Sequence, residues 1–64
     1  MQHADPKEVV IVFKDSKVKS RKFSNPDIVY DGNRTITVGF ETFKRSEVKE
    51  VTVKTKTGTF TYPY

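Results

Sequence analysis

The densest group of chemically active side chains in this sequence is a basic run from Lys14 to Lys22. It contains five lysine or arginine residues and one aspartate, a local charge of +4 that equals the charge of the whole chain. If the run forms a strand, alternation places Lys17, Lys19 and Arg21 on one face. Such a stripe can neutralise successive phosphates of a nucleic acid without reading its bases. It can equally be a solvated strand whose lysines discourage edge-to-edge pairing, and both interpretations stay open.

Two further lysines and two tyrosines extend this candidate surface. Lys54 and Lys56 lengthen the stripe if their strand lies beside it. Tyr30 and Tyr62 are candidates for rim aromatics, because tyrosine is enriched at protein interfaces. The complete set of candidate binding residues is Lys17, Lys19, Arg21, Lys22, Lys54, Lys56, Tyr30 and Tyr62.

A base-stacking motif is the usual companion of a basic sheet that binds single strands. The best match is residues 38–43, in which Phe40 and Phe43 are three positions apart. The RNA-recognition pattern needs aromatics two positions apart, on one strand face. In a regular strand these two rings point to opposite sides, so the motif fails.

The sequence lacks the residues that catalysis requires. Cysteine is absent, which excludes a thiolate nucleophile, and a single histidine cannot form a multi-histidine metal site. That histidine, His3, falls in a segment expected to be disordered, so no serine has a histidine partner. No glycine-rich loop leads from a strand into a helix to hold a phosphate. We therefore expect no enzyme, no cofactor, no metal and no small-molecule substrate.

Composition predicts the elements that must position these residues. Leucine is absent and alanine occurs once, whereas 28 of the 64 residues are β-branched or aromatic. Such side chains lose rotamer freedom in a helix and pack well on a pleated sheet. A chain of this length buries only about 60% of its unfolded surface, so it makes one small domain. We expect an all-β domain with almost no helix.

Local alternation and turn residues divide the chain into short strands. Residues 8–14 are apolar on both faces, which is typical of a central or curled strand. The run Asp31-Gly32-Asn33 predicts a hairpin with a type I′ turn, and Gly39 predicts a bulge or bend. The expected strands cover residues 8–14, 17–23, 28–30, 35–40, 50–56 and 59–62.

Valine, isoleucine and phenylalanine must fill the interior because leucine is absent. Residues 41–47 break the alternation, and Ser46 can cap a single helical turn that places Val48 and Val51 in the core. Four phenylalanines are expected to pack there as well, namely Phe13, Phe23, Phe40 and Phe60.

These strands predict a small antiparallel barrel or a curled β-roll of about five to six short strands, SH3-like or Sm-like in size. Residues 1–6 show no periodicity and are expected to be a disordered tail, followed by one domain over residues 7–64. Closure into a barrel would also remove strand edges that otherwise pair with other chains.

The function expected from this pattern is binding of another macromolecule without catalysis. A protein partner or a second copy of the chain is the leading prediction, and strand addition to a sheet edge is one available mode. Sequence-nonspecific nucleic-acid binding through a basic face is the alternative. This face consists of Lys17, Lys19, Arg21 and Lys22, and Lys44, Arg45, Lys54 and Lys56 can extend it. No apolar run approaches the ~20 residues of a membrane span, and no signal-peptide core is present, so we expect a cytoplasmic protein.

Overall fold

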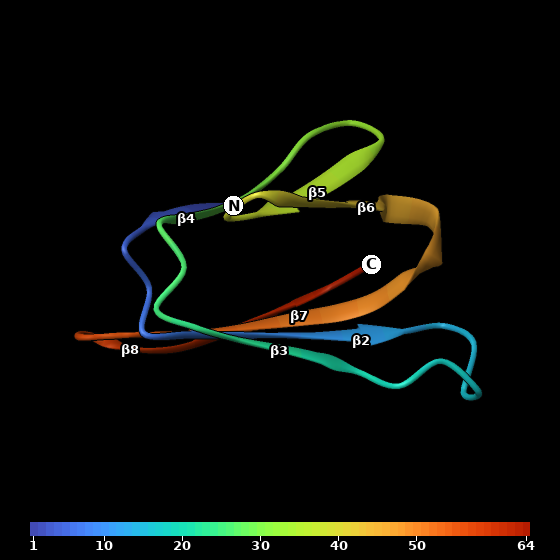
Figure 1. Ribbon diagram of the computed structural model, residues 1–64, viewed down its shortest axis with the longest axis horizontal. Coiled ribbons are helices and arrows are strands. Elements are labelled where there is room, and N and C mark those ends of the chain that lie inside the picture. The colour runs from blue at the N-terminus through green and yellow to red at the C-terminus, as the bar shows by residue number, and fades with distance from the viewer.

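Two four-stranded antiparallel sheets face one another in the structure, a computed structural model that describes residues 1–64 (Figure 1). The first sheet has the strand order β1-β4-β5-β6 and the second has β3-β2-β7-β8. The strands are β1 (Gln2–Ala4), β2 (Glu8–Phe13), β3 (Arg21–Ser24), β4 (Ile28–Asp31), β5 (Thr35–Val38), β6 (Glu41–Lys44), β7 (Val48–Thr55) and β8 (Gly58–Pro63). A single 3₁₀ turn, η1 (Arg45–Glu47), carries the chain from β6 in one sheet to β7 in the other (Figure 1).

The core lies between the two sheets and consists of valine and isoleucine alone. Alternation along β7 buries Val51 and Val53 completely and turns Thr52 and Lys54 outward, as predicted. The eight core residues are Val9, Ile11, Val29, Ile36, Val38, Val48, Val51 and Val53. Branched side chains therefore supply both the strand preference and the interior of the domain.

The all-β class is confirmed, and the architecture is a curled pair of sheets, not a closed barrel. The sheets number eight strands, two more than the upper bound of the prediction. One additional strand is β6, within the segment where we expected the alternation to break. The facing edges of the two sheets are joined by side chains and not by a backbone ladder, so the sheets remain separate.

The other additional strand is β1, which occupies the segment predicted to be a disordered tail. Gln2 is paired with Tyr30, and Ala4 with Ile28, in an antiparallel register with β4. The following Pro6 is buried, and the Asp5 amide donates to the Asp27 carbonyl at 2.8 Å. A strand of three residues has too short a pattern to be recognised locally, because its partner lies far along the chain.

The predicted strand over residues 17–23 begins only at Arg21. The preceding residues form a loop, in which Asp15 accepts hydrogen bonds from the amides of Lys17 and Val18, both at 3.0 Å. An aspartate that satisfies amides a few residues ahead of it stabilises a turn in competition with a strand. Lys17 and Lys19 are consequently loop residues.

The expected aromatic core is only partly correct. Phe13 and Phe23 are half-buried, and both pack against Phe43 with ring centroids 5.7 and 6.0 Å apart. Phe60 is 40% exposed and Phe40 is fully exposed, so the prediction was wrong for Phe40. The β5 strand ends at Val38, and the β5–β6 turn that follows directs the Phe40 ring into solvent.

The turns follow the predicted positions but differ in geometry. The hairpin joining β4 to β5 is present, yet Gly32 and Asn33 do not have the positive φ of a type I′ turn. Gly39 does have a positive φ, +58°, and it makes a tight turn where a bulge or bend was expected. The predicted helical turn is η1, and Val48 is fully buried after it, but no side chain caps it.

The structure contains no helix with the length and apolarity that crossing a lipid bilayer requires.

Candidate functional site

The basic stripe predicted from the sequence does not form a single surface. Arg21 and Lys22 are neighbours in β3, so they lie on opposite faces of the second sheet. Arg21 is paired with the buried Ile11 and faces the first sheet, whereas Lys22 is paired with Val10 and faces solvent. Lys17 and Lys19 lie outside both faces, in the β2–β3 loop.

Arg21 is fully engaged within the molecule. Its guanidinium donates to both carboxylate oxygens of Glu41 in β6, at 2.8 and 3.0 Å. The same group lies over the rings of Phe23 and Phe43, 5.1 and 5.8 Å from their centroids. The guanidinium of Arg21 therefore connects the β3 edge to the β6 edge.

Lys22 and Lys54 flank one carboxylate on the outer face of the second sheet. Each ammonium lies 3.2 Å from an oxygen of Glu8, which belongs to the strand between theirs. Hydrogen bonds from Lys22 and then from Lys54 lower the pKa of Glu8. Lys54 thus lies close to Lys22 across the intervening strand β2, but the carboxylate of Glu8 between them partly neutralises the pair.

The remaining exposed lysines of the candidate set lie far apart. Lys56 is in the β7–β8 turn, and Lys17 and Lys19 are in the β2–β3 loop. Since β2 and β7 are antiparallel, these two connections are at opposite ends of the second sheet (Figure 1). They do not form one row of cations.

The two candidate tyrosines also face different directions. Tyr30 is paired with Thr37 on the outer face of the first sheet and is 40% exposed. Tyr62 is half-buried in β8, where its hydroxyl lies 2.6 Å from Nε2 of His3 in β1. His3 also stacks on Phe60 at 5.2 Å. The histidine expected in a tail instead joins the β1 and β8 edges of the two sheets.

The free edges of the sheets differ in how they are protected. The β3 edge carries Arg21 and Lys22, the β6 edge carries Glu41 and Lys44, and β1 is only three residues long. The β8 edge is six residues long and contains no charged side chain. Short length, charge and proline are the usual defences of an edge strand against pairing with another chain, and β8 has only Pro63, at its last position.

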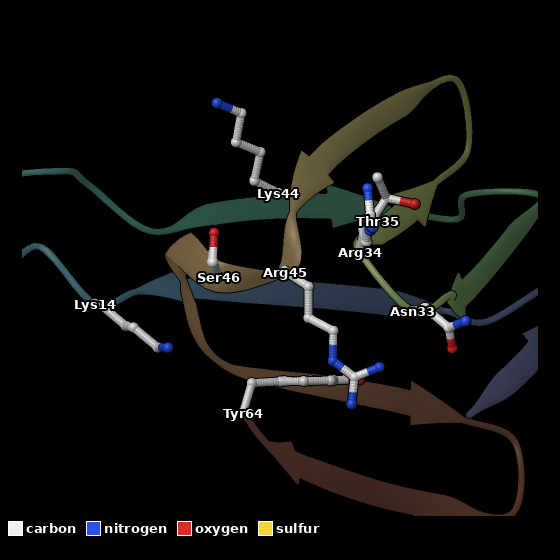
Figure 2. Close-up of a pocket in the computed structure, with 8 residues that line it drawn as sticks. All are labelled: Lys14, Asn33, Arg34, Thr35, Lys44, Arg45, Ser46 and Tyr64. Atoms are coloured by element: carbon white, nitrogen blue, oxygen red, sulfur yellow. The ribbon is translucent and has the colours of Figure 1, made fainter.

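A concave surface that sequence reasoning missed lies where the β4–β5 turn, the end of β6 and η1 meet (Figure 2). It has a volume of about 610 Å³ and is lined by Lys14, Asn33, Arg34, Thr35, Lys44, Arg45, Ser46 and Tyr64. We call it the cationic hollow. Its basic residues come from three separate segments, so no run of charge in the sequence indicates it.

Partly buried polar contacts extend from the cationic hollow toward the N-terminus of the chain. Arg45 donates to the Gly32 carbonyl at 2.7 Å, and its guanidinium lies 4.9 Å from the centre of the Tyr64 ring (Figure 2). The Tyr64 hydroxyl donates to Asp31 at 2.6 Å, and the amino group of Met1 lies 2.7 Å from the other carboxylate oxygen. These groups form a chain of contacts from Arg45 to the first strand.

This chain of contacts shifts two pKa values in opposite directions. Hydrogen bonds from the Met1 amino group and from the Tyr64 hydroxyl lower the pKa of Asp31. Burial, together with the hydrogen bond that the hydroxyl donates to Asp31, raises the pKa of Tyr64 well above its usual range. The structure contains no group of three or more histidine, aspartate or glutamate side chains placed to hold a metal ion.

No protein-family model, curated protein or solved structure matches this chain.

Proposed function

We propose that this domain binds another protein chain, either a partner or a second copy of itself, by adding a strand along the free edge of β8. The observation that carries the proposal is the contrast between β8 and the other three edges. The β8 strand, Gly58-Thr59-Phe60-Thr61-Tyr62-Pro63, is the longest edge and the only one of usable length without charge. An edge strand of this kind offers its outward N–H and C=O groups to another extended chain.

The side chains of β8 suit such a partner. Phe60 stacks on His3 and is still 40% exposed on the inner side of the edge, and Thr59 and Thr61 are exposed on the outer side. An added strand would place its own alternating side chains beside these residues, which provides apolar contact on one face and hydroxyl contact on the other. Self-pairing of two β8 strands about a two-fold axis would bring no like charges together.

The test uses two matched threonine variants. Thr61 in β8 and Thr42 in β6 are both exposed, both on edge strands, and both within 3.4 Å of a threonine hydroxyl on the neighbouring strand. A lysine on the β8 edge, Thr61→Lys, should block strand addition, because a charge there resists pairing. Thr42→Lys makes the same chemical change on the other sheet and should leave binding intact.

Sedimentation equilibrium over a range of concentrations measures self-association, and affinity capture with the same variants measures partner binding. We expect the wild-type chain and Thr42→Lys to associate, and Thr61→Lys to remain free. Equal behaviour of the two variants in both assays would show that β8 is not the binding edge.

Sequence-nonspecific binding of nucleic acid through the predicted basic residues stays the alternative. Its support is weaker because Arg21, Lys22 and Lys54 each contact a carboxylate. Titration with labelled DNA and RNA at two salt concentrations tests it, since phosphate contacts weaken steeply as salt rises. The cytoplasmic location also stays a prediction.

A further inference from the structure

We propose that the cationic hollow binds an anion that carries several phosphate groups, such as inorganic triphosphate or the phosphate chain of a nucleotide. This site is distinct from the β8 edge, and its four basic residues are Lys14, Arg34, Lys44 and Arg45. Lys14 opens the basic run of the sequence, and Lys44 and Arg45 extend the basic face of the nucleic-acid alternative, but the sequence does not place them together with Arg34.

The charge of the cationic hollow is uncompensated. None of its four basic residues forms an ion pair, and no carboxylate lines it. Asp31 interacts electrostatically with Arg45, but one of its oxygens is occupied by the Met1 amino group and the other by the Tyr64 hydroxyl. Glu47 and Asp15 line a neighbouring hollow, which shares Lys14 and Ser46. Four cations without counter-charges in a concave surface create a positive potential that attracts anions.

Backbone hydrogen bonds hold the converging segments together. The Arg45 amide donates to the Arg34 carbonyl at 2.9 Å, which fixes η1 against the β4–β5 turn. The Lys14 amide donates to the Glu47 carbonyl at 2.9 Å, which fixes the end of β2 against η1. Thr35 and Lys44 are paired in the β5–β6 register. The positions from which the cations extend are therefore set by the fold.

The arrangement of the basic side chains suits a ligand that carries several separate negative charges. Lys14 and Arg45 extend on the Tyr64 side of η1, whereas Lys44 extends on the opposite side (Figure 2). A single phosphate cannot contact groups that point in such different directions, but a chain of phosphates can. Asn33, Thr35 and Ser46 add neutral hydrogen-bond donors.

The size of the cationic hollow and the residues that line it suit a small anion. The volume of about 610 Å³ lies within the range of small-molecule sites, which is roughly 300–1,000 Å³. Tyr64 is the only hydrophobic residue of the lining, and the Arg45 guanidinium lies over its ring. The groups that can recognise a ligand here are charged or hydrogen-bonding, and charge-assisted hydrogen bonds from arginine and lysine favour phosphate.

The experiment measures binding of inorganic triphosphate to the full chain by calorimetry at about 0.1 M ionic strength, where the Debye length is about 10 Å and charges outside the hollow are largely screened. The double variant Arg34→Gln/Lys44→Gln removes two cations of the hollow whose side chains form no hydrogen bond or ion pair, so the fold should be retained. The control, Lys49→Gln/Lys56→Gln, removes the same charge outside the hollow. We expect the affinity to fall by at least about tenfold in the first and to stay within about twofold in the second.

Chemical-shift mapping on the wild-type chain gives a second measurement that needs no variant. Triphosphate should perturb the amides of residues 33–35 and 44–46. Equal loss of affinity in both double variants, perturbation centred on residues 17–22, or no binding by the wild-type chain would each overturn the proposal. If a nucleoside triphosphate binds more tightly than inorganic triphosphate, the ligand of the hollow is a nucleotide. If the two affinities are equal, the hollow contacts only the phosphate groups. The Thr61→Lys variant should bind triphosphate normally, so this test and that of the β8 edge are independent.

Discussion

The Arg21 guanidinium donates to both carboxylate oxygens of Glu41, at 2.8 and 3.0 Å, and so joins β3 of one sheet to β6 of the other. The same guanidinium covers two phenylalanine rings at the margin of the core. Both charged side chains are 47% exposed, so water screens their attraction. This contact directs how the two open edges approach, but it adds little to the free energy of unfolding.

A double-mutant cycle with Arg21→Gln and Glu41→Gln should therefore give a coupling energy of about 0.5 kcal/mol. The coupling should shrink at high salt, because screening weakens an exposed ion pair. Arg21→Gln alone should cost about 0.5–1 kcal/mol more than Glu41→Gln, because it also removes the contact with the rings. Urea unfolding of the four proteins measures these differences. A coupling that does not change with salt would contradict the ion-pair interpretation.

The core assignment separates two apolar residues that look alike in the sequence. Ile36 is completely buried and Phe40 is completely exposed. Ile36→Val should destabilise the domain by about 1 kcal/mol, since it leaves a small cavity. Phe40→Ala removes a much larger side chain but should change stability by no more than about 0.5 kcal/mol. Thermal unfolding compares the two, and a larger cost for Phe40→Ala would show that this ring is buried.

Gly39 and Gly32 form a matched pair of turn glycines. Gly39 has a φ of +58°, whereas Gly32 is not among the positive-φ residues. A Cβ atom at either site meets its nearest atom at an ordinary distance, 3.8 Å at Gly39 and 3.7 Å at Gly32. Backbone strain is thus the main difference, and Gly39→Ala should cost about 1–2 kcal/mol more than Gly32→Ala. Equal costs in chemical denaturation would contradict the left-handed turn.

Tyr64 should make the domain sensitive to alkaline pH. Burial and the bond to Asp31 raise the pKa of its phenol in the folded state, whereas unfolding restores the ordinary value of about 10. The unfolded state therefore releases this proton first, and stability falls as pH rises above about 10. Tyr64→Phe should remove this part of the alkaline loss. Urea unfolding at a series of pH values measures this loss. The same dependence of unfolding free energy on pH in both proteins would contradict a raised pKa of the half-buried phenol.

Asp31 should make the domain sensitive to acid pH, whereas Tyr64 makes it sensitive to alkaline pH. Hydrogen bonds to its carboxylate, first from the Met1 amino group and then from Tyr64, lower the folded-state pKa. The contribution is present above the ordinary value of about 4 and is lost as pH falls through the lower folded value. Asp31→Asn should be less stable than the wild-type chain near neutral pH, and the difference should narrow in acid. A constant difference over this range would argue against ionisation of Asp31 as the cause.

Local pattern predicted those parts of the fold that depend on neighbouring residues. The β-branched and aromatic composition indicated an all-β chain, and alternation assigned Val51 and Val53 to the interior. The strand predicted over residues 17–23 begins only at Arg21, because residues of a loop can show the same alternation as a strand. His3 was assigned to a tail because its contacts with Tyr62 and Phe60 join residues nearly sixty positions apart.

In the candidate site, too, the local sequence indicated the charged side chains but not the distant residues that they contact. From the sequence, Arg21, Lys22 and Lys54 are cations on outward faces, and nothing local indicates Glu41 or Glu8 as their partners. Lys14 belongs to the basic run and Lys44 and Arg45 are adjacent in the sequence, but no local pattern shows that the fold brings them together with Arg34.

By itself, the sequence determined that this chain forms strands and which side chains of the regular strands point inward, because strand preference and alternation act between near neighbours. Only the tertiary structure decided that the sheets stay open, that β8 is an uncharged edge, and that Lys14, Arg34, Lys44 and Arg45 surround one hollow. Those outcomes depend on which distant strands pair and on where the turns bring their ends. Many pairings are compatible with the same local pattern, and the burial of one shared core selects among them.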